Sequence, residues 1–234
     1  ETGAVTLCLP QDTQAEAFDY PESFLAKKVW HLDRRTPHPR ALKEAVSILS
    51  SAQKPLIVAG GGVHYSQAAE TLRAFSETFG IPVSETQAGK SAMSWKDPMS
   101  VGAVGVTGTS AANLLAKAAD VVLVVGSRLQ DFTTASKQIF ASDVKLLHLN
   151  VSKFDGLKMD SIMLQADAKS GLESLSEELL KAKFQTSAEY RGCVSQLQSE
   201  WNAEVDRLYN LTSEEGNVQT SIVGTLNEFM APED

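Results

Sequence analysis

The sequence predicts an α/β protein with a doubly wound, mostly parallel sheet of about six strands, a Rossmann-like architecture. Short continuous apolar runs, such as 55–59 and 121–125, alternate along the chain with longer segments whose apolar residues recur at helical spacing. Continuous apolar runs are typical of parallel strands that are buried on both faces. Because a parallel strand needs a crossover before the next one, this alternation favours a sheet with helices on both faces.

The elements can be placed in order along the chain. Strands are expected at 55–59, 81–85, 121–125, 145–151 and 162–166, and helices at 40–52, 67–79, 110–119 and 169–183. Ser66 is expected to cap the N-terminus of helix 67–79, because its hydroxyl can accept a hydrogen bond from a free N–H group of the first turn. Gly80 is expected to end the helix, because glycine tolerates a left-handed backbone. The glycine series in 102–110 reads as a loop that leads into the next helix.

Both ends of the chain read as parts of something longer. Residues 3–12 read as a strand, which would have an unpaired edge. Residues 186–211 read as a polar connecting helix with one narrow apolar edge, and an amphipathic helix with Ile222, Leu226 and Phe229 follows in 220–234. We therefore expect an excised piece of a larger protein.

Composition limits the classes of partner. The net charge of −8, without a basic cluster, argues against nucleic acid. The longest apolar runs are far too short to span a bilayer, so no membrane partner is expected. The four histidines show no ligand spacing, so no metal site is expected. The cytoplasm is the expected compartment.

Glycines and polar residues follow the expected strands, at the edge where doubly wound sheets bind ligands. They are Gly60–Gly62, Gln87, Gly89, Lys90, Gly126–Arg128 and Asn150. Glycine turns and helix N-termini can hold a phosphate there. The dinucleotide fingerprint nevertheless fails, because Tyr65 stands where its third glycine belongs. The alternative is that these are ordinary sheet-to-helix turns, with Arg128 bridging to Asp131.

Residues 102–131, which read GAVGVTGTSAANLLAKAADVVLVVGSRLQD, resemble the central domain of thiamine-diphosphate-dependent enzymes, the relatives of acetolactate synthase and pyruvate decarboxylase. The segments KPLIVAGGGV and LLHLNVSKFD are similar to the parts that flank it. The resemblance implies four segments. They are the tail of a pyrimidine-binding domain and its linker at 1–22, the central Rossmann-like domain at 23–185, a polar linker helix at 186–215, and the start of a pyrophosphate-binding domain at 216–234.

Three loops, 84–95, 105–113 and 128–136, resemble one branch of that family, which hydrolyses a ring carbon–carbon bond of a cyclic dione in myo-inositol catabolism. The resemblance implies thiamine diphosphate and Mg²⁺ as cofactors of the full-length enzyme, a small-molecule substrate and a homo-oligomeric assembly. The family's Gly-Asp-Gly motif and its activating glutamate are not found in this chain. We therefore expect the chain alone to bind neither cofactor, to supply no catalytic residue or metal ligand, and to self-associate weakly.

The resemblance also implies two sets of site residues. Some relatives bind a flavin or adenine nucleotide at the loops that contain Gly60, Gly61, Gly62, Arg128 and Asn150. Here Asn150 replaces the acidic residue that often recognises the ribose, so we expect this site to be vestigial. The candidates for a wall of the substrate channel are Gln87, Lys90, Gln130 and Phe132.

Two other functions remain open at this point. The chain could be an autonomous nucleotide-binding module for FAD, ADP or NAD, or a regulatory module. It could also belong to another acetolactate synthase-like enzyme. The intact reading frame separates a module from a fragment, because three such domains predict roughly 600 residues.

Overall fold

A computed structural model of the protein describes residues 4–214 and 216–231. The chain divides into two compact units, one that precedes Arg34 and one that begins at Arg34. The ends of the expected segments 1–22, 186–215 and 216–234 include residues 1–3, 215 and 232–234, which lie outside the described residues.

The first unit contains two short helices, α1 (Gln11–Ala15) and α2 (Glu22–Leu25), and residues 4–33 are exposed throughout. The strand expected at 3–12 is wrong for the described residues, because 4–10 adopt no regular structure and α1 begins at Gln11. A strand needs a neighbour that pairs with its N–H and C=O groups, and the described residues of this unit offer none.

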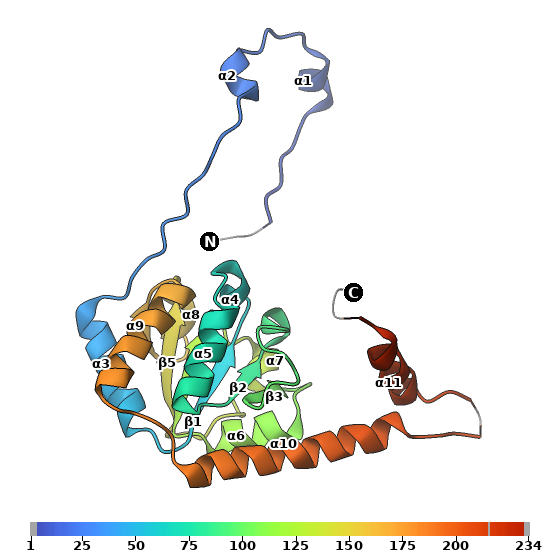
Figure 1. Cartoon of the computed structure of the whole chain (residues 1–234). Helices are drawn as coiled ribbons and strands as arrows, with labels where there is room; N and C mark the ends of the chain where they lie inside the picture. The colour runs from blue at the N-terminus through green and yellow to red at the C-terminus, as the bar shows by residue number, and fades with distance from the viewer. Residues whose placement is uncertain (1–3, 215, 232–234) are drawn as a thin grey trace. The chain divides into compact units, whose positions relative to one another are not determined.

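The second unit contains the predicted sheet. The sheet lies at the centre of this unit, between helices (Figure 1). Its six strands lie in the order β3-β2-β1-β4-β5-β6, and every neighbouring pair is parallel. The strands are β1 (Pro55–Ala59), β2 (Val83–Glu85), β3 (Ser100–Ala103), β4 (Val121–Val125), β5 (Lys145–Asn150) and β6 (Ile162–Gln165). The first three strands therefore lie on one side of the boundary between β1 and β4, and the last three lie on the other, as in doubly wound nucleotide-binding sheets. The predicted fold class is confirmed.

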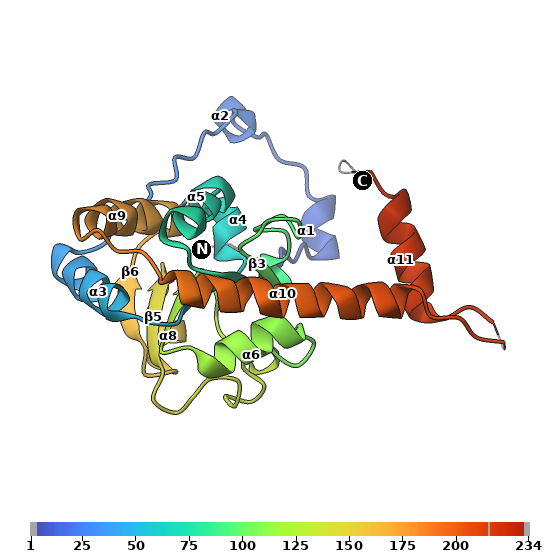
Figure 2. The same cartoon turned by 60° about the horizontal axis from the view of Figure 1, so that its bottom comes forward.

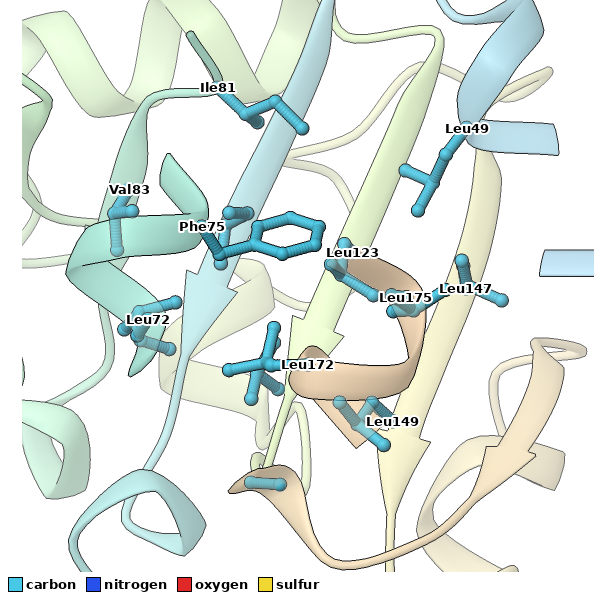
Figure 3. Packing of buried hydrophobic residues seen from close by; sticks show 14 of the residues in the cluster. Leu49, Leu72, Phe75, Ile81, Val83, Leu123, Leu147, Leu149, Leu172 and Leu175 are labelled. Atoms are coloured by element: carbon cyan, nitrogen blue, oxygen red, sulfur yellow. The ribbon is translucent and has the colours of Figure 1, made fainter. Parts of the chain in front are cut away.

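Helices cover both faces of the sheet, because each central strand sends alternate apolar side chains to opposite sides. On one face, α3 (Pro39–Ser51), α5 (Ala69–Phe79) and α9 (Ala168–Lys181) contribute to one buried core with the central strands. Figure 3 shows their side chains Leu49, Leu72, Phe75, Leu172 and Leu175 together with Leu123 of β4 and Leu147 and Leu149 of β5. On the other face, α6 (Ser110–Ala118) and the first part of α10 (Ala188–Tyr209) pack side by side (Figure 2). The two resulting cores hold the loops at the strand ends in place.

Two local predictions were wrong. Strand β3 was not expected, because Ser100–Ala103 is short and contains Gly102, whose φ of +81° is unusual in a strand. Ser66 is not the N-cap of α5, which begins at Ala69 after Ala68. Ser66 instead ends an additional short helix, α4 (Gly62–Tyr65). Sequence patterns do not reveal such a single turn, because four residues are too few for a periodic signal.

The remaining elements lie in the loops or near the C-terminus. They are η1 (Gln87–Gly89), α7 (Asp131–Thr134), α8 (Phe154–Leu157) and α11 (Gln219–Phe229). The predicted connecting helix is α10, which buries Tyr190 and Val194 near its start. Helix α11 packs Gly224 against the ring of Tyr209, near the end of α10. None of the described helices is both long enough and apolar enough to cross a bilayer.

Candidate functional site

The structure gathers the predicted site residues at the carboxyl edge of the sheet, around the switch point between β1 and β4. The loops that follow the strands contribute Gly60–Gly62 after β1, Gln87 and Lys90 after β2, Arg128, Gln130 and Phe132 after β4, and Asn150 at the end of β5. Ligands of doubly wound sheets bind at this position. The contacts within the loops decide whether there is room for one.

The glycine turn after β1 packs directly on the loop after β4. The amide of Gly60 donates to the carbonyl of Val125 (N···O 2.8 Å), and that of Gly62 donates to Gly126 (2.9 Å). A Cβ atom on Gly60 would lie 2.5 Å from the carbonyl oxygen of Gly126, and one on Gly62 would lie 2.6 Å from its Cα. The glycines therefore allow two backbones to touch, and these contacts occupy the space between the turn and the loop after β4.

The loop after β3 closes over the same region. The amide of Val106 donates to the carbonyl of Phe132 (2.9 Å), although β3 and β4 are separated in the sheet by β2 and β1. Gly105, at a φ of +109°, permits this approach, because a Cβ there would lie 2.8 Å from the Cα of Thr133. Three glycine contacts thus bring the loops of β1, β3 and β4 together by their backbones.

Asn150 makes internal hydrogen bonds. Its Nδ2 donates to the carbonyl of Ser127 (3.0 Å), and its Oδ1 accepts from the amide of Ser152 (3.1 Å). The side chain is buried. A ribose hydroxyl would have to reach a buried amide that is already bonded on both its oxygen and its nitrogen, and only the remaining lone pair and hydrogen could serve it.

His148, also buried, shares the Ser127 carbonyl. Because a carbonyl only accepts, Nε2 carries the proton and donates to it (2.7 Å). Among the described atoms, Nδ1 of His148 has no hydrogen-bond partner. Burial lowers the pKa of His148 below its usual 6.5, more than the Ser127 carbonyl and Asp155 raise it. The imidazole is therefore neutral near pH 7 and fixes the loop after β4.

Arg128 and Gln130 are exposed, and so is Phe132. The ion pairs found among the described residues do not include Arg128. The alternative that it bridges to Asp131 is not seen, since the Asp131 carboxylate instead accepts from the hydroxyl of Ser136 (3.3 Å).

Sequence reasoning missed Glu85, the last residue of β2. This carboxylate is buried, with 3% of the residue exposed. It accepts from the amides of Met93 (2.8 Å) and Ser91 (3.3 Å), so it holds the loop that carries Gln87 and Lys90. The available signal was an acidic residue at the end of the expected strand IPVSE.

A second cluster that was missed surrounds Asp167, the N-cap of α9. Its Oδ1 accepts from the amides of Lys169 and Ser170, and its Oδ2 accepts from the Ser66 hydroxyl (2.7 Å) and from Arg34 (3.0 Å). The cluster joins α4, α9 and the chain that precedes α3. Its donors and acceptors satisfy one another, so it is a structural clamp.

The described residues contain no cluster of potential metal ligands. They include no group of three or more His, Cys, Asp or Glu side chains that could hold a metal ion, whereas Mg²⁺ prefers carboxylate oxygens, waters and phosphates. A groove of about 300 Å³ lies elsewhere, beside the segments that precede β5 and β6. It lies away from the carboxyl edge.

Residues 42–175 match the family model described as "Thiamine pyrophosphate enzyme, central domain". These residues include all six strands of the sheet and the whole carboxyl edge. The chain belongs to the thiamine pyrophosphate enzymes. The resemblance of residues 102–131 to the central domain of this family is confirmed.

Two curated relatives are both named 3D-(3,5/4)-trihydroxycyclohexane-1,2-dione hydrolase. The protein of Clostridium tetani is 45% identical over 224 residues, which cover 95% of this chain and 34% of the relative. That of Geobacillus thermodenitrificans is 46% identical over 228 residues, 97% of this chain and 35% of the relative. The chain therefore spans about a third of the length of the curated relatives it matches. Their name is that of the cyclic-dione branch that three loops resembled.

Proposed function

We propose that the chain is the central structural domain of a thiamine-diphosphate-dependent hydrolase that cleaves a carbon–carbon bond of trihydroxycyclohexane-1,2-dione in myo-inositol degradation. One observation carries the proposal. The identity of about 45% to hydrolases of that name extends over nearly the whole chain, including segments outside the matched residues 42–175. Similarity of this extent goes beyond a shared fold, which by itself does not imply a shared function.

We further propose that thiamine diphosphate and Mg²⁺ are held by parts of the full-length enzyme outside this chain, so that this chain alone is inactive. At its carboxyl edge, Asp131 and Asp155 lie on different segments, and Glu85 and Asp167 already accept hydrogen bonds from the chain itself. Mg²⁺ takes one or two carboxylates together with waters and phosphate oxygens in near-octahedral geometry, and among the described residues no cluster of three or more His, Cys, Asp or Glu side chains offers such a site. The cofactor supplies the electron sink for breaking the carbon–carbon bond.

For the central domain itself, the proposed role is to form one wall of the substrate channel through Gln87, Lys90, Gln130 and Phe132. All four side chains are exposed at the carboxyl edge. The nucleotide site at Gly60–Gly62, Arg128 and Asn150 is proposed to be vestigial. The backbone contacts of Gly60 and Gly62 with Gly126, and the internal bonds of Asn150, support this.

The segments at 1–22, 23–185, 186–215 and 216–234 keep their proposed identities, from the pyrimidine-binding domain to the start of the pyrophosphate-binding domain. The full-length enzyme is proposed to be a cytoplasmic homo-oligomer. Within the described parts of the expected neighbouring domains, Leu7, Leu9 and Phe229 are exposed, as expected of side chains that contact other parts of the enzyme.

The test is turnover by the intact gene product. The purified full-length enzyme, supplied with thiamine diphosphate and Mg²⁺, is expected to convert the cyclic dione to an open-chain acid, while the 234-residue chain is not. The same enzyme is offered pyruvate, because condensation of pyruvate without hydrolysis of the dione would favour another acetolactate synthase-like activity and overturn the proposal.

A further inference from the structure

The loop after β2 is held by a buried carboxylate, that of Glu85. Glu85 is 3% exposed, and the ion pairs found in the described part of the chain do not include it. Its carboxylate is stabilised by the amides of Ser91 and Met93. A buried charge with few partners costs free energy that an apolar residue of similar size would not. Its effect is to fix the positions of two amides in the loop.

The same loop is held at three further points. Gly89 packs against the carbonyl of Ala59, and the amide of Gly89 donates to the hydroxyl of Thr86 (3.1 Å). Nε2 of His64, on α4, donates to the carbonyl of Lys90 (3.0 Å). Ser91 has a φ of +69°, a left-handed backbone conformation that residues other than glycine adopt at a cost in free energy. Strain of this kind persists only where surrounding contacts enforce it, and it is frequent at ligand-binding sites.

The residue that these contacts fix is Lys90. Its side chain is exposed, and the ion pairs identified within residues 4–214 and 216–231 do not include its ammonium group. A lysine ammonium is a compact cation with three donors, suited to carboxylate and carbonyl oxygens. A fixed backbone reduces the entropy lost when such a group binds a ligand.

We propose that Gln87–Met93 is a preformed oxyanion-binding loop of the substrate channel, in which Lys90 binds the ligand and Glu85 and His64 are positioning residues. The inference rests on the proposed function, and the ligand class is the carboxylate of the ring-opened product. Hydrolysis of a 1,2-dione breaks the bond between its carbonyl carbons. The hydroxyl of water goes to one carbon, which becomes a carboxylic acid, and a hydrogen goes to the other, which becomes an aldehyde. A neutral substrate thus becomes an anion.

The experiment compares variants of the full-length enzyme under identical cofactor saturation. Lys90→Met is expected to lower kcat/KM at least tenfold and to weaken inhibition by the ring-opened product at least tenfold. Lys90→Arg is expected to restore part of both. Lys96→Met is the matched control, because Lys96 lies outside Gln87–Met93 in the same connection between β2 and β3 and contacts the ring of Trp95 (5.2 Å to its centroid). It should change neither value more than twofold.

The positioning role has its own readout. Glu85→Gln is expected to lower kcat/KM, to weaken product inhibition and to speed hydrogen exchange in peptides that contain Ser91 and Met93. The double variant Glu85→Gln with Lys90→Met is expected to have the same kcat/KM as Lys90→Met alone, because both changes remove the same interaction with the ligand. A purely structural Glu85 would instead add its loss to that of Lys90→Met, which would overturn its positioning role.

The outcomes separate the two proposals. If the wild-type enzyme does not hydrolyse the dione, the proposed function fails, and this inference fails with it. If the wild-type enzyme does hydrolyse it but Lys90→Met behaves like Lys96→Met, only the oxyanion-binding loop is overturned.

Discussion

The Nε2 atom of His148, on β5, lies 2.7 Å from the carbonyl oxygen of Ser127, in the loop after β4. The Nδ2 atom of Asn150 donates to the same oxygen (3.0 Å). Two buried side chains of one strand therefore hold the neighbouring loop, which carries Arg128, Gln130 and Phe132. At this point of the carboxyl edge, the loop after β4 is therefore held both by these side chains and by the backbone hydrogen bonds of Gly60 and Gly62.

This arrangement predicts how stability changes with pH. Burial lowers the pKa of His148 in the folded state, while the unfolded chain keeps the usual value of 6.5. Below about pH 6.5 the unfolded state binds a proton that the folded state does not, so the free energy of unfolding falls as the pH falls. Urea unfolding of the chain between pH 7.5 and 5.5 is expected to show this decrease.

The contribution of His148 is isolated by comparing variants. His148→Gln is expected to be less stable at pH 7.5 and to lose less stability on acidification. His31→Gln, which changes an exposed histidine, should keep the wild-type slope. A His148→Gln variant with the wild-type slope would contradict the role of His148.

The glycine turn predicts a contrast between two alanine variants. Gly60→Ala would place a methyl group 2.5 Å from a backbone oxygen, so the loops must separate. We expect a loss of about 2 kcal/mol or more, in the range of overpacked cores. Gly192, on α10, has no atom within 4 Å of an added Cβ. Gly192→Ala should therefore stabilise the chain by about 0.5–1 kcal/mol. Equal effects in thermal or urea unfolding would show that the loops are not in contact.

The closed switch point predicts weak nucleotide binding. FAD, NAD and ADP are each expected to bind the chain with a dissociation constant above about 100 μM, a binding free energy weaker than about −5.5 kcal/mol. Calorimetric titration measures this directly. Micromolar binding of any of the three would restore the autonomous nucleotide-binding module as the better hypothesis.

Thiamine diphosphate with Mg²⁺ is expected to leave the melting temperature of the chain unchanged, because a ligand stabilises only the state that it binds. Differential scanning fluorimetry at millimolar cofactor tests this, with the full-length enzyme as the positive control. A shift of several degrees for the chain alone would show that it holds a cofactor site of its own.

Self-association of the chain is expected to be weak and dependent on concentration. Apolar side chains are exposed on α11, notably Ile222, Leu226 and Phe229, and such surfaces favour association without a defined stoichiometry. Light scattering should give an average mass that rises gradually with concentration. A tight tetramer at low micromolar concentration would contradict this expectation.

The sequence by itself determined the elements whose signal is local. Continuous apolar runs identified β1 and β4, because strands buried on both faces are rich in apolar residues along their whole length. Helical periodicity identified α3 and α9 to within two residues at each end. The family could be recognised for the same reason, since its glycines and apolar runs are contiguous in the chain.

Only the tertiary structure decided what the loops do. Gly60, Gly105 and Asn150 were visible as residues that could serve a ligand, but their contacts with Gly126, Phe132 and Ser127 join segments that are distant in sequence. The hydrogen bond from Ser66 to Asp167 was missed for the same reason. A local pattern records which donors, acceptors and glycines are present, whereas their partners are set by the packing of the whole sheet.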